Sequence, residues 1–315
     1  MCAKKIDMKI VFLDASTLGA ASLEPIKALG ELVCYPYSSP AEALERVKEA
    51  EVLIINKVKV TAGLMDAAPK LKLICEAATG VNNIDLEAAA ARGIPVKNVA
   101  GYSTDSVVQL TFALILNLLC RTASYDNYIK GGEYSASPIF TEVSRPFPEL
   151  AGKTMGIVGM GTIGQRVAKV AEAFGMKVIY FSTSGTSHCK DYPSVTIDEL
   201  MGASDIVSIH APLNARTNWL IKAREISLMR PSAIIINIGR GGIVDEQALA
   251  DAISEGRIAG AGLDVFTSEP LPAGNPLLHT AHPERLSLTP HIGWASREAL
   301  SRLVDGIALN ISESL

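Results

Sequence analysis

The fold of this chain is set by one stretch, Thr154-Met-Gly-Ile-Val-Gly-Met-Gly-Thr-Ile-Gly-Gln-Arg-Val-Ala168. Its first residues, Thr154–Val158, form an apolar run that is typical of a short buried strand. Apolar residues then recur at helical spacing over 165–174, and Lys177–Phe181 reads as a second strand. Strand, tight turn, helix and strand in this order predict a βαβ unit.

Three glycines in the turn, Gly159, Gly161 and Gly164, have the G-x-G-x-x-G spacing of dinucleotide-binding folds. The first permits the tight turn, the second lets the backbone approach a pyrophosphate, and the third lets the helix pack on the strand. The N–H groups of Thr162 and Ile163 then face the phosphates, and the helix dipole adds attraction for negative charge. The flanking strand and helix favour dinucleotide binding over a glycine-rich turn that binds nothing.

Composition places the chain among ordinary globular proteins. Its 315 residues are many for a single hydrophobic core, so we expect two domains. Hydrophobic residues make up 48% of the chain and charged residues 20%, and the formal net charge is −4. This charge balance offers no basic stripe, which argues against nucleic acid and anionic membranes as partners.

The sequence also predicts a cytoplasmic protein without a membrane span. The N-terminus leads into a strand without an apolar leader, and the longest apolar stretch, Val107–Cys120, is short and holds polar residues. Five cysteines lie far apart without C-x-x-C spacing: Cys2, Cys34, Cys75, Cys120 and Cys189. We interpret them as reduced thiols. No set of His or Cys has metal-ligand spacing, so we expect no metal site.

The N-terminal part alternates strands and helices at the spacing that builds a parallel sheet. Strands are expected at 9–13, 31–35, 51–55 and 71–75, and helices at 23–29, after Ser39-Pro40 and from about Thr61. The loop Ala77–Asp85 follows the fourth strand at its carboxyl end, where open α/β sheets bind ligands. Gly80 lets N–H groups of this loop turn toward an anion, although an ordinary βα turn fits the same residues.

The remainder of the chain begins with a long apolar helix over 106–121, which predicts a spine between two domains. Residues 121–151 mix polar, Gly, Pro and aromatic residues, and we interpret them as an extended arm that covers a partner subunit. Further strands are expected at 154–158, 177–181, 206–210, 232–237, 260–265 and 286–289. A final helix over 297–313, apolar on one face, is expected to cross back to the first domain.

The position that normally selects the dinucleotide lacks its usual acid. About 20 residues after the glycines, an NAD-binding unit places Asp or Glu on the ribose 2′-hydroxyl. This chain has Tyr180-Phe-Ser-Thr-Ser-Gly185 there, and no arginine stands nearby in the sequence. The hydroxyls of residues 182–184, and more remotely His188 and Lys190, are the available partners, so the choice between NAD and NADP stays open.

Candidate chemistry is carried by Arg240 in Asn237-Ile-Gly-Arg-Gly-Gly242, Glu269 in Asp264-Val-Phe-Thr-Ser-Glu-Pro270 and His291 in Thr289-Pro-His-Ile-Gly-Trp294. Each alone has an ordinary interpretation, as a surface ion-pair partner, a loop carboxylate and a satisfied loop histidine. Their joint placement after a dinucleotide unit favours an acid–base site. His279 and His282 fit no such pattern, and we interpret them as structural or solvent-facing.

The ordered motifs resemble the D-isomer-specific 2-hydroxyacid dehydrogenase family over essentially the full chain. The matches are G-M-G-T-I-G, H-A-P-L-N at His210–Asn214, N-x-G-R-G, L-D-V-F with E-P, and P-H-I-G. Within the family, Thr104-Asp-Ser-Val-Val-Gln109 and Trp294 resemble glycerate dehydrogenases, also called hydroxypyruvate reductases. Two departures are Ser182 in place of the usual acid and Ala77-Ala-Thr-Gly80 in place of an arginine-containing loop.

The resemblance implies an α/β fold of two doubly wound parallel-sheet domains. A flavodoxin-like substrate domain is implied for residues 1–103 plus 293–315, and a Rossmann cofactor domain for 104–292, with a dimerisation arm at about 121–151. The implied protein is a homodimer that uses NAD(H) or NADP(H). It reduces a small 2-keto acid, hydroxypyruvate and more poorly glyoxylate, to the D-2-hydroxy acid by hydride transfer.

Residue roles follow from the same resemblance at the matching positions. His291 is the implied proton donor, Glu269 fixes its tautomer, and Arg240 offers a planar fork to the substrate. The implied substrate-binding N–H groups belong to Thr79, Gly80 and Val81. The implied cofactor-binding residues are Thr104, Gly159, Gly161, Thr162, Ile163, Gly164, Ser182, His210, Ala211, Pro212, Ile238, Gly239 and Asp264.

Other functions fit the same sequence. Enzymes of this family also act on 3-phosphoglycerate, D-lactate or glyoxylate, although a phosphorylated substrate would want cationic residues that the Ala77–Asp85 loop does not supply. Dinucleotide-sensing corepressors share the fold and keep the three polar residues. Turnover of hydroxypyruvate with NADH or NADPH would separate an enzyme from such a binding protein.

Overall fold

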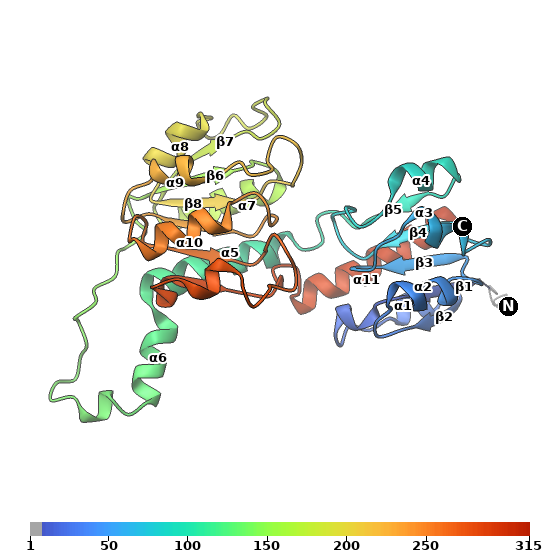
Figure 1. The fold of residues 1–315 in the computed structure, drawn as a ribbon, viewed down its shortest axis with the longest axis horizontal. Helices are drawn as coiled ribbons and strands as arrows, with labels where there is room; N and C mark the ends of the chain where they lie inside the picture. The colour runs from blue at the N-terminus through green and yellow to red at the C-terminus, as the bar shows by residue number, and fades with distance from the viewer. Residues whose placement is uncertain (1–7) are drawn as a thin grey trace. The chain divides into compact units, whose positions relative to one another are not determined.

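The computed structural model describes residues 8–315 of the chain. The described chain divides into two compact units (Figure 1). The first holds the residues up to Ser103 together with Trp294–Leu315, and the second is Thr104–Gly293. Each unit is built on one parallel sheet, so the expected α/β fold with two such sheets is confirmed. Cys2 and the expected lack of an apolar leader concern residues outside the described range.

The sheet of the first unit has the strand order β2-β1-β3-β4-β5, which is the flavodoxin-like order. Its strands are β1 (Lys9–Phe12), β2 (Glu31–Cys34), β3 (Val52–Ile55), β4 (Leu73–Glu76) and β5 (Val96–Lys97). Because all of them run parallel, the loops after β1, β3 and β4 open at one edge of the sheet. That edge carries the loop in which the sequence predicts substrate binding.

Helices cover both faces of this sheet. Buried residues of α1 (Glu24–Lys27) and α11 (Arg297–Ser314) pack on one face, and those of α2 (Pro40–Arg46), α3 (Ala62–Asp66) and α4 (Leu86–Ala91) pack on the other. Ser39 and Thr61 cap α2 and α3 through their side chains, at the positions where the sequence predicted these helices to begin. A 3₁₀ turn, η1 (Ala15–Leu18), follows β1.

The sheet of the second unit has the order β11-β10-β9-β8-β6-β7, again all parallel. Its strands are β6 (Thr154–Val158), β7 (Lys177–Phe181), β8 (Ile206–Ile209), β9 (Ile234–Asn237), β10 (Gly260–Leu263) and β11 (Leu286–Leu288). Strand order reverses between β6 and β8, and the G-x-G-x-x-G turn follows β6. Ligands of open α/β sheets bind at such a reversal.

Helices also cover both faces of this second sheet. One face is covered by α5 (Thr104–Cys120) and α7 (Thr162–Ala173), and the other by α8 (Ile197–Ala203), α9 (Ala223–Ser227) and α10 (Glu246–Ser254). Short 3₁₀ turns η3 (Pro276–His279) and η4 (Pro283–Arg285) precede β11. Within residues 8–315 no single helix is long and apolar enough to cross a membrane; only α5 and the next helix together pass that test, as a pair bent by 59°.

The segment that the sequence predicted as an extended arm is only partly extended. It begins with a helix, α6 (Thr122–Lys130), and a 3₁₀ turn, η2 (Tyr134–Ala136), before an irregular return to β6. Tyr125, Tyr128 and Ile129 recur at helical spacing, which explains why this part is helical. Figure 1 shows α6 and the returning chain projecting away from the body of the second unit.

Candidate active site

The glycine-rich turn after β6 has the geometry that a dinucleotide needs. Gly159 has a φ of +95°, and a Cβ there would lie 3.0 Å from the backbone of Ala211. A Cβ at Gly164 would lie 2.3 Å from the carbonyl oxygen of Gly159, so glycine alone lets α7 pack this closely on β6. A Cβ at Gly161 would meet no described atom within 4 Å. The turn therefore leaves room where a pyrophosphate would approach the backbone.

The N-terminus of α7 presents free backbone donors beside this space. Gly161 is its N-cap residue, no side chain caps the helix, and its first turn holds no acidic residue. The N–H groups of Thr162, Ile163 and Gly164 have no acceptor inside the helix. Together with the helix dipole they form an anion site that suits the phosphates of a dinucleotide.

The loops after β8 and β9 meet the glycine-rich turn. A Cβ at Gly239 would lie 2.9 Å from the carbonyl oxygen of Ala211, which itself adjoins Gly159. In the same loop, Nε2 of His210 lies 2.8 Å from the hydroxyl oxygen of Ser208. Burial lowers the pKa of His210 to about 4, so its ring is neutral near pH 7. A neutral imidazole at this place adds no charge to the phosphate site.

His291 and Glu269 form a hydrogen-bonded pair. Nδ1 of His291 lies 2.7 Å from Oε2 of Glu269, while Oε1 of Glu269 accepts the backbone N–H of Phe266 at 3.0 Å. The two side chains are 24% and 35% exposed, so both remain accessible to a ligand. An ionised carboxylate can only accept, which places a proton on Nδ1 and leaves Nε2 for another partner.

Asp264, the residue after β10, holds the backbone around His291. Its Oδ1 accepts the Thr289 hydroxyl at 2.6 Å and the Ile292 N–H at 2.8 Å, and its Oδ2 accepts the Gly293 N–H at 2.8 Å. Burial raises the pKa of the Asp264 carboxyl, and these three hydrogen bonds oppose that rise. His291 itself has a φ of +54°, so the carboxylate fixes a left-handed backbone next to the imidazole.

Arg240 lies in the loop after β9, which touches the segment that leads to Glu269. The side-chain amide of Asn237 donates to the carbonyl oxygen of Arg240 at 3.0 Å, and Nη1 of Arg240 donates to the preceding carbonyl oxygen at 2.8 Å. A Cβ at Gly241 would lie 1.9 Å from the carbonyl oxygen of Phe266. No carboxylate within residues 8–315 forms an ion pair with Arg240. Its fork is therefore available to an anion.

The predicted substrate loop lies in the first unit, after β4. Asn98 donates its side-chain amide to the carbonyl oxygen of Thr79 at 2.6 Å, and the Thr79 hydroxyl donates to the Val99 carbonyl oxygen at 3.2 Å. Among the described residues, the backbone N–H groups of Thr79, Gly80 and Val81 find no acceptor. The loop is thus held through the carbonyl oxygen and the hydroxyl of Thr79, while these three successive N–H groups have no described acceptor.

Glu76 immediately precedes this loop and is fully buried. Its Oε2 accepts the side-chain amide of Asn83 at 2.9 Å, but its Oε1 and both polar atoms of the Asn56 side chain are buried without a partner among the described residues. Burial raises the pKa of Glu76 to about 9, and the negative charge of nearby Asp14 acts in the same direction. Glu76 is therefore a neutral acid near pH 7.

Asp14 fixes the neighbouring loop after β3. Its carboxylate accepts the backbone N–H groups of Asn56, Lys57 and Val58 at 3.0, 2.5 and 3.0 Å. Asn83 also donates to the carbonyl oxygen of Val58 at 3.1 Å. These bonds connect the loops after β1, β3 and β4, so the predicted substrate loop rests on a cross-linked base.

At the ribose position the structure corrects the sequence analysis. Ser182 follows β7 as expected, but an arginine does stand nearby, because Arg216 reaches over from the loop after β8. Nη1 of Arg216 donates to the carbonyl oxygen of Ser184. The two residues are 32 positions apart in sequence, so spacing alone gives no sign of this contact.

The structure brings most predicted residues of the second unit to the carboxyl edge of one sheet. Ile238 joins them, since a Cβ at Gly293 would lie 3.0 Å from its side chain, and Pro212 continues the loop of Ala211. Thr104 is the first residue of α5, and Thr79–Val81 lie in the other unit. His279 and His282 contact Ala273 and Glu284, outside this cluster.

Glu246 also supports the site, although no motif in the sequence points to it. Glu246 is 9% exposed, and its carboxylate accepts the Thr267 N–H and the Asn275 amide at 2.6 Å each. It thereby ties the Glu269 segment to α10. Its only sequence signal is an acidic residue at the start of a helix, where acidic residues are common.

Comparisons with known proteins agree with this geometry. The family model for the NAD-binding domain of D-isomer-specific 2-hydroxyacid dehydrogenases matches residues 112–293. A putative 2-hydroxyacid dehydrogenase of Haemophilus influenzae is 38% identical, over 97% of this chain and 98% of its own length. The glycerate dehydrogenase of Methylorubrum extorquens is also 38% identical, over 96% of this chain and 95% of its own length.

A solved structure shows the same likeness in three dimensions. It is an NADPH-dependent glyoxylate/hydroxypyruvate reductase from Sinorhizobium meliloti, in complex with NADP and malonate. It superposes with a TM-score of 0.83 at 28% identity, and the match covers 97% of this chain and 93% of that one. Together with the glycine-rich turn and the hydrogen-bonded pair of His291 and Glu269 in the same unit, these matches show that the chain belongs to the D-isomer-specific 2-hydroxyacid dehydrogenase family.

Proposed function

We propose that this chain reduces hydroxypyruvate to D-glycerate with a nicotinamide dinucleotide, and glyoxylate more slowly. The observation that carries the proposal is the His291–Glu269 pair, held by Asp264 at the sheet edge that also bears the glycine-rich turn. Relatives that span nearly the whole chain include a glycerate dehydrogenase and a hydroxypyruvate reductase. The small side chains of the Ala77-Ala-Thr-Gly80 loop suit a small substrate.

The dinucleotide, when bound, supplies the hydride for the carbonyl carbon. Nε2 of His291 then gives its proton to the carbonyl oxygen, and Glu269 keeps Nδ1 protonated and stabilises the imidazolium before transfer. In the opposite direction the neutral ring takes the proton back. Imidazole suits both directions because its charge changes near neutral pH.

The substrate carboxylate needs donors, and this chain offers two sets of them. Arg240 carries a guanidinium that no described carboxylate neutralises, and its planar fork can bind a carboxylate and a carbonyl oxygen together. The N–H groups of Thr79, Gly80 and Val81 are the second set. We propose Arg240 and these N–H groups as substrate-binding groups, because a fixed carboxylate orients the carbonyl carbon for hydride transfer.

Turnover of a substrate panel tests the proposal. We expect loss of NAD(P)H absorbance with hydroxypyruvate, slower loss with glyoxylate, and little with pyruvate or 3-phosphohydroxypyruvate. Pyruvate turnover exceeding that of hydroxypyruvate by about tenfold would assign a D-lactate dehydrogenase instead. Dinucleotide binding without turnover of any 2-keto acid would favour the corepressor-like alternative.

Two variants test the assigned roles. His291→Gln should lower kcat by about 10²–10⁴-fold and leave dinucleotide affinity nearly unchanged, because it removes a general acid. Arg240→Lys should raise KM and lower kcat, because an ammonium keeps the charge and loses the fork. A His291→Gln enzyme with more than about half the parental kcat would remove His291 from the mechanism.

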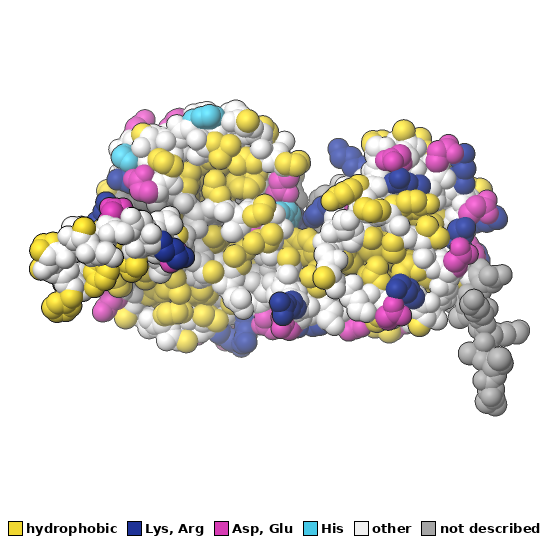
Figure 2. All heavy atoms as spheres, turned by 90° about the horizontal axis from the view of Figure 1, so that it is seen from below, with side chains coloured by type: hydrophobic (Ala, Val, Ile, Leu, Met, Phe, Trp, Pro, Cys, Tyr) yellow, Lys and Arg dark blue, Asp and Glu magenta, His cyan; other side chains and the backbone are white. Residues whose placement is uncertain are grey.

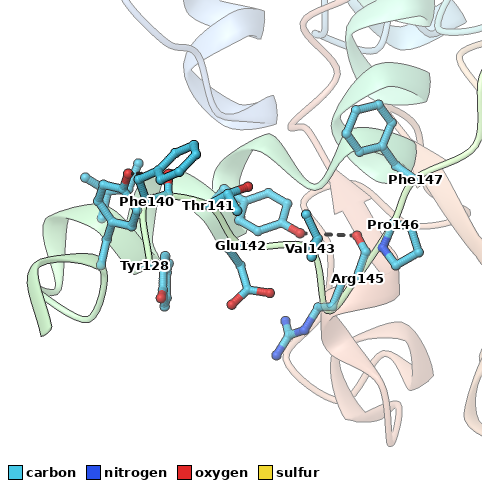
Figure 3. A pocket seen from close by; sticks show the side chains of 11 residues that line it. Tyr128, Phe140, Thr141, Glu142, Val143, Arg145, Pro146 and Phe147 are labelled. Carbon is cyan, nitrogen blue, oxygen red and sulfur yellow. Dashed lines mark hydrogen bonds between the residues drawn. The ribbon is translucent and has the colours of Figure 1, made fainter. Parts of the chain in front are cut away.

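We also propose that the arm forms a homodimer. It exposes several large apolar side chains, among them Phe140 at 91% and Val143 at 71%. Figure 2 shows apolar side chains along the arm and on the adjoining face of the same unit. Between α6 and the returning chain lies a concavity of about 550 Å³, lined by residues that include Tyr128 and Phe147 (Figure 3). Two further lining residues are hydrogen-bonded, since the hydroxyl of Tyr125 donates to the carbonyl oxygen of Arg145 at 3.2 Å. A second copy of this chain is the occupant we propose.

Sedimentation at several protein concentrations tests the dimer. The parent should sediment as a dimer, whereas Phe140→Asp and Val143→Asp should shift the equilibrium toward monomer, because each buries a charge in an apolar interface. Tyr37→Asp is a matched control, since Tyr37 is 74% exposed and belongs to the first unit rather than to the arm. A parent that stays monomeric would refute the proposal.

A cytoplasmic location completes the proposal. The described cysteines, Cys34, Cys75, Cys120 and Cys189, are all free thiols. Burial raises the pKa of Cys75 to about 12, which keeps this thiol protonated and unreactive. Free thiols of this kind are typical of a reducing compartment.

A further inference from the structure

We propose that Arg216 binds the 2′-phosphate of NADP and makes this chain NADPH-preferring. The inference rests on the proposed function, since it names which dinucleotide that site takes. It starts from the position after β7, where a dinucleotide fold meets the ribose 2′ group. Ser182 stands there, so no carboxylate repels a phosphate at this place.

The turn after β7 is built from hydroxyl groups. The oxygens of Ser182 and Ser184 lie 3.1 Å apart, and both hydroxyls donate to the carbonyl oxygen of Thr186, at 2.6 and 3.0 Å. Two hydroxyls therefore lie side by side at the ribose position. Each can turn its hydrogen toward a phosphate oxygen, because a hydroxyl rotates to suit its acceptor.

The backbone of Arg216 is fixed in a tight turn after β8. Its N–H donates to Oδ1 of Asn214 at 2.9 Å, and the Asn214 N–H donates to the hydroxyl of Thr217 at 2.9 Å. That hydroxyl donates to the carbonyl oxygen of Pro212 at 2.6 Å, and Thr217 is fully buried. The turn adjoins Ala211, so Arg216 is anchored to the loop beside the glycine-rich turn.

From this anchor the guanidinium of Arg216 lies over the hydroxyl-rich turn. Nη1 donates to the carbonyl oxygen of Ser184, and a Cβ at Gly185 would lie 2.9 Å from Nη1. Gly185 has a φ of +80°, so a residue without a side chain both makes the turn and leaves space for the guanidinium. The sequence places a glycine where the arginine needs room.

The guanidinium of Arg216 is not neutralised by a described carboxylate. Within residues 8–315 no carboxylate forms an ion pair with it, whereas Arg224 in the same unit is paired with Asp198 and Glu225. One hydrogen bond to Ser184 holds the guanidinium in place and leaves most of its five N–H donors unused. A held, unpaired fork beside two hydroxyls is the donor set that a phosphate dianion requires.

A simpler role for Arg216 would be to pin the turn after β7. Both roles predict weaker dinucleotide binding when Arg216 is removed, so total affinity does not separate them. They differ in selectivity. Loss of a pin weakens NADH and NADPH equally, whereas loss of a phosphate ligand weakens NADPH alone.

The experiment compares binding of four probes by calorimetry, without turnover. The pairs are NADPH against NADH and adenosine 2′,5′-bisphosphate against 5′-AMP, which differ only in the 2′-phosphate. Arg216→Ala should raise the Kd of both phosphorylated probes by about tenfold to a hundredfold, as expected for a lost charge-assisted bond, and change the other two by less than about twofold. Arg216→Lys should fall between, because it keeps charge without the fork.

Two further variants complete the design. Arg224→Ala is the matched control and should leave all four Kd values unchanged. Ser182→Asp should raise the NADPH Kd and lower that of NADH, shifting their ratio by at least about tenfold, because a carboxylate repels the 2′-phosphate and binds the 2′-hydroxyl. Equal losses for both members of a pair in Arg216→Ala, or none, would overturn the assignment of Arg216. Failure of the parent to bind either dinucleotide would instead refute the proposed function.

Discussion

Replacing Glu76 with glutamine should stabilise this protein increasingly as pH rises. Glu76 is fully buried, one of its oxygens has no described partner, and burial raises its pKa from 4.5 to about 9. Between these two values the unfolded chain releases the proton while the folded chain keeps it. Stability is therefore lost as pH rises from about 4.5 toward 9, at up to about 1.4 kcal/mol per pH unit. Glutamine is neutral throughout and does not have this penalty.

The expected size follows from that slope. From about pH 5.5 to about pH 8, the stability of Glu76→Gln relative to the parent should grow by about 3 kcal/mol, slightly less than the limiting slope gives over this range. The side-chain oxygen of glutamine can still accept the Asn83 amide, so the one hydrogen bond to Glu76 is kept. Urea unfolding of both proteins at several pH values, with the slope on urea checked for equality, measures the difference.

Glu51→Gln serves as a control, because the pKa of Glu51 is shifted in the opposite direction to that of Glu76. Glu51 is 22% exposed and accepts Nζ of Lys72 at 2.6 Å, and this bond lowers the pKa of its carboxyl. Its stabilising effect is fully present above the ordinary carboxyl pKa, so the difference between Glu51→Gln and parent should stay flat over the same pH range. A flat difference for Glu76→Gln as well would mean that Glu76 is ionised in the folded protein, and the reasoning would fail.

Two further predictions concern the catalytic pair and the dinucleotide turn. Glu269→Gln should lower kcat by about tenfold to a hundredfold, because it removes the negative charge that faces Nδ1 of His291. Dinucleotide affinity should stay unchanged, and the glutamine oxygen can still accept the Phe266 N–H. An unaltered kcat would show that the charge of Glu269 does not contribute to catalysis. Gly161→Ala should abolish dinucleotide binding but keep the melting temperature, because the added Cβ meets no described atom and occupies only the space for the pyrophosphate. Gly164→Ala should lower both the dinucleotide affinity and the melting temperature, because its Cβ would lie 2.3 Å from the carbonyl oxygen of Gly159. Equal melting temperatures for the two variants would contradict the packing argument.

The sequence predicted the strands well because each is a short apolar run with polar ends. Thr154–Val158 and Lys177–Phe181 were predicted residue for residue, and the other expected strands differ by one or two residues at one or both ends. The two-residue strand β5 was not predicted. Short helices were harder. The alanine-rich α4 (Leu86–Ala91) and α9 (Ala223–Ser227) went unnoticed, since a helix of one or two turns has too few apolar positions to show a period.

Motifs located the candidate site, but only geometry shows how it is held. The P-H-I-G and E-P motifs named His291 and Glu269 as candidates, and the structure places them 2.7 Å apart. Asp264 accepts hydrogen bonds from the N–H groups of Ile292 and Gly293, which lie 28 and 29 positions further along the chain. No sequence spacing rule connects such positions. The same limit hid Arg216, whose contact arises because the loops after β7 and β8 flank β6 in the sheet.

The distribution of charge explains how a protein with a net charge of −4 can favour an anionic substrate. The four acids described above at the candidate site are either satisfied by hydrogen bonds or neutral. Glu269 faces an imidazole and an N–H group, Asp264 accepts three hydrogen bonds, Asp14 accepts three backbone N–H groups, and Glu76 keeps its proton. Arg240, in contrast, has no described carboxylate beside it. These negative charges are already compensated, whereas the charge of Arg240 is not, so a small carboxylate forms a full ion pair with Arg240 on binding. Acids elsewhere on the surface weaken this ion pair only slightly, because water and salt screen their charges over distance.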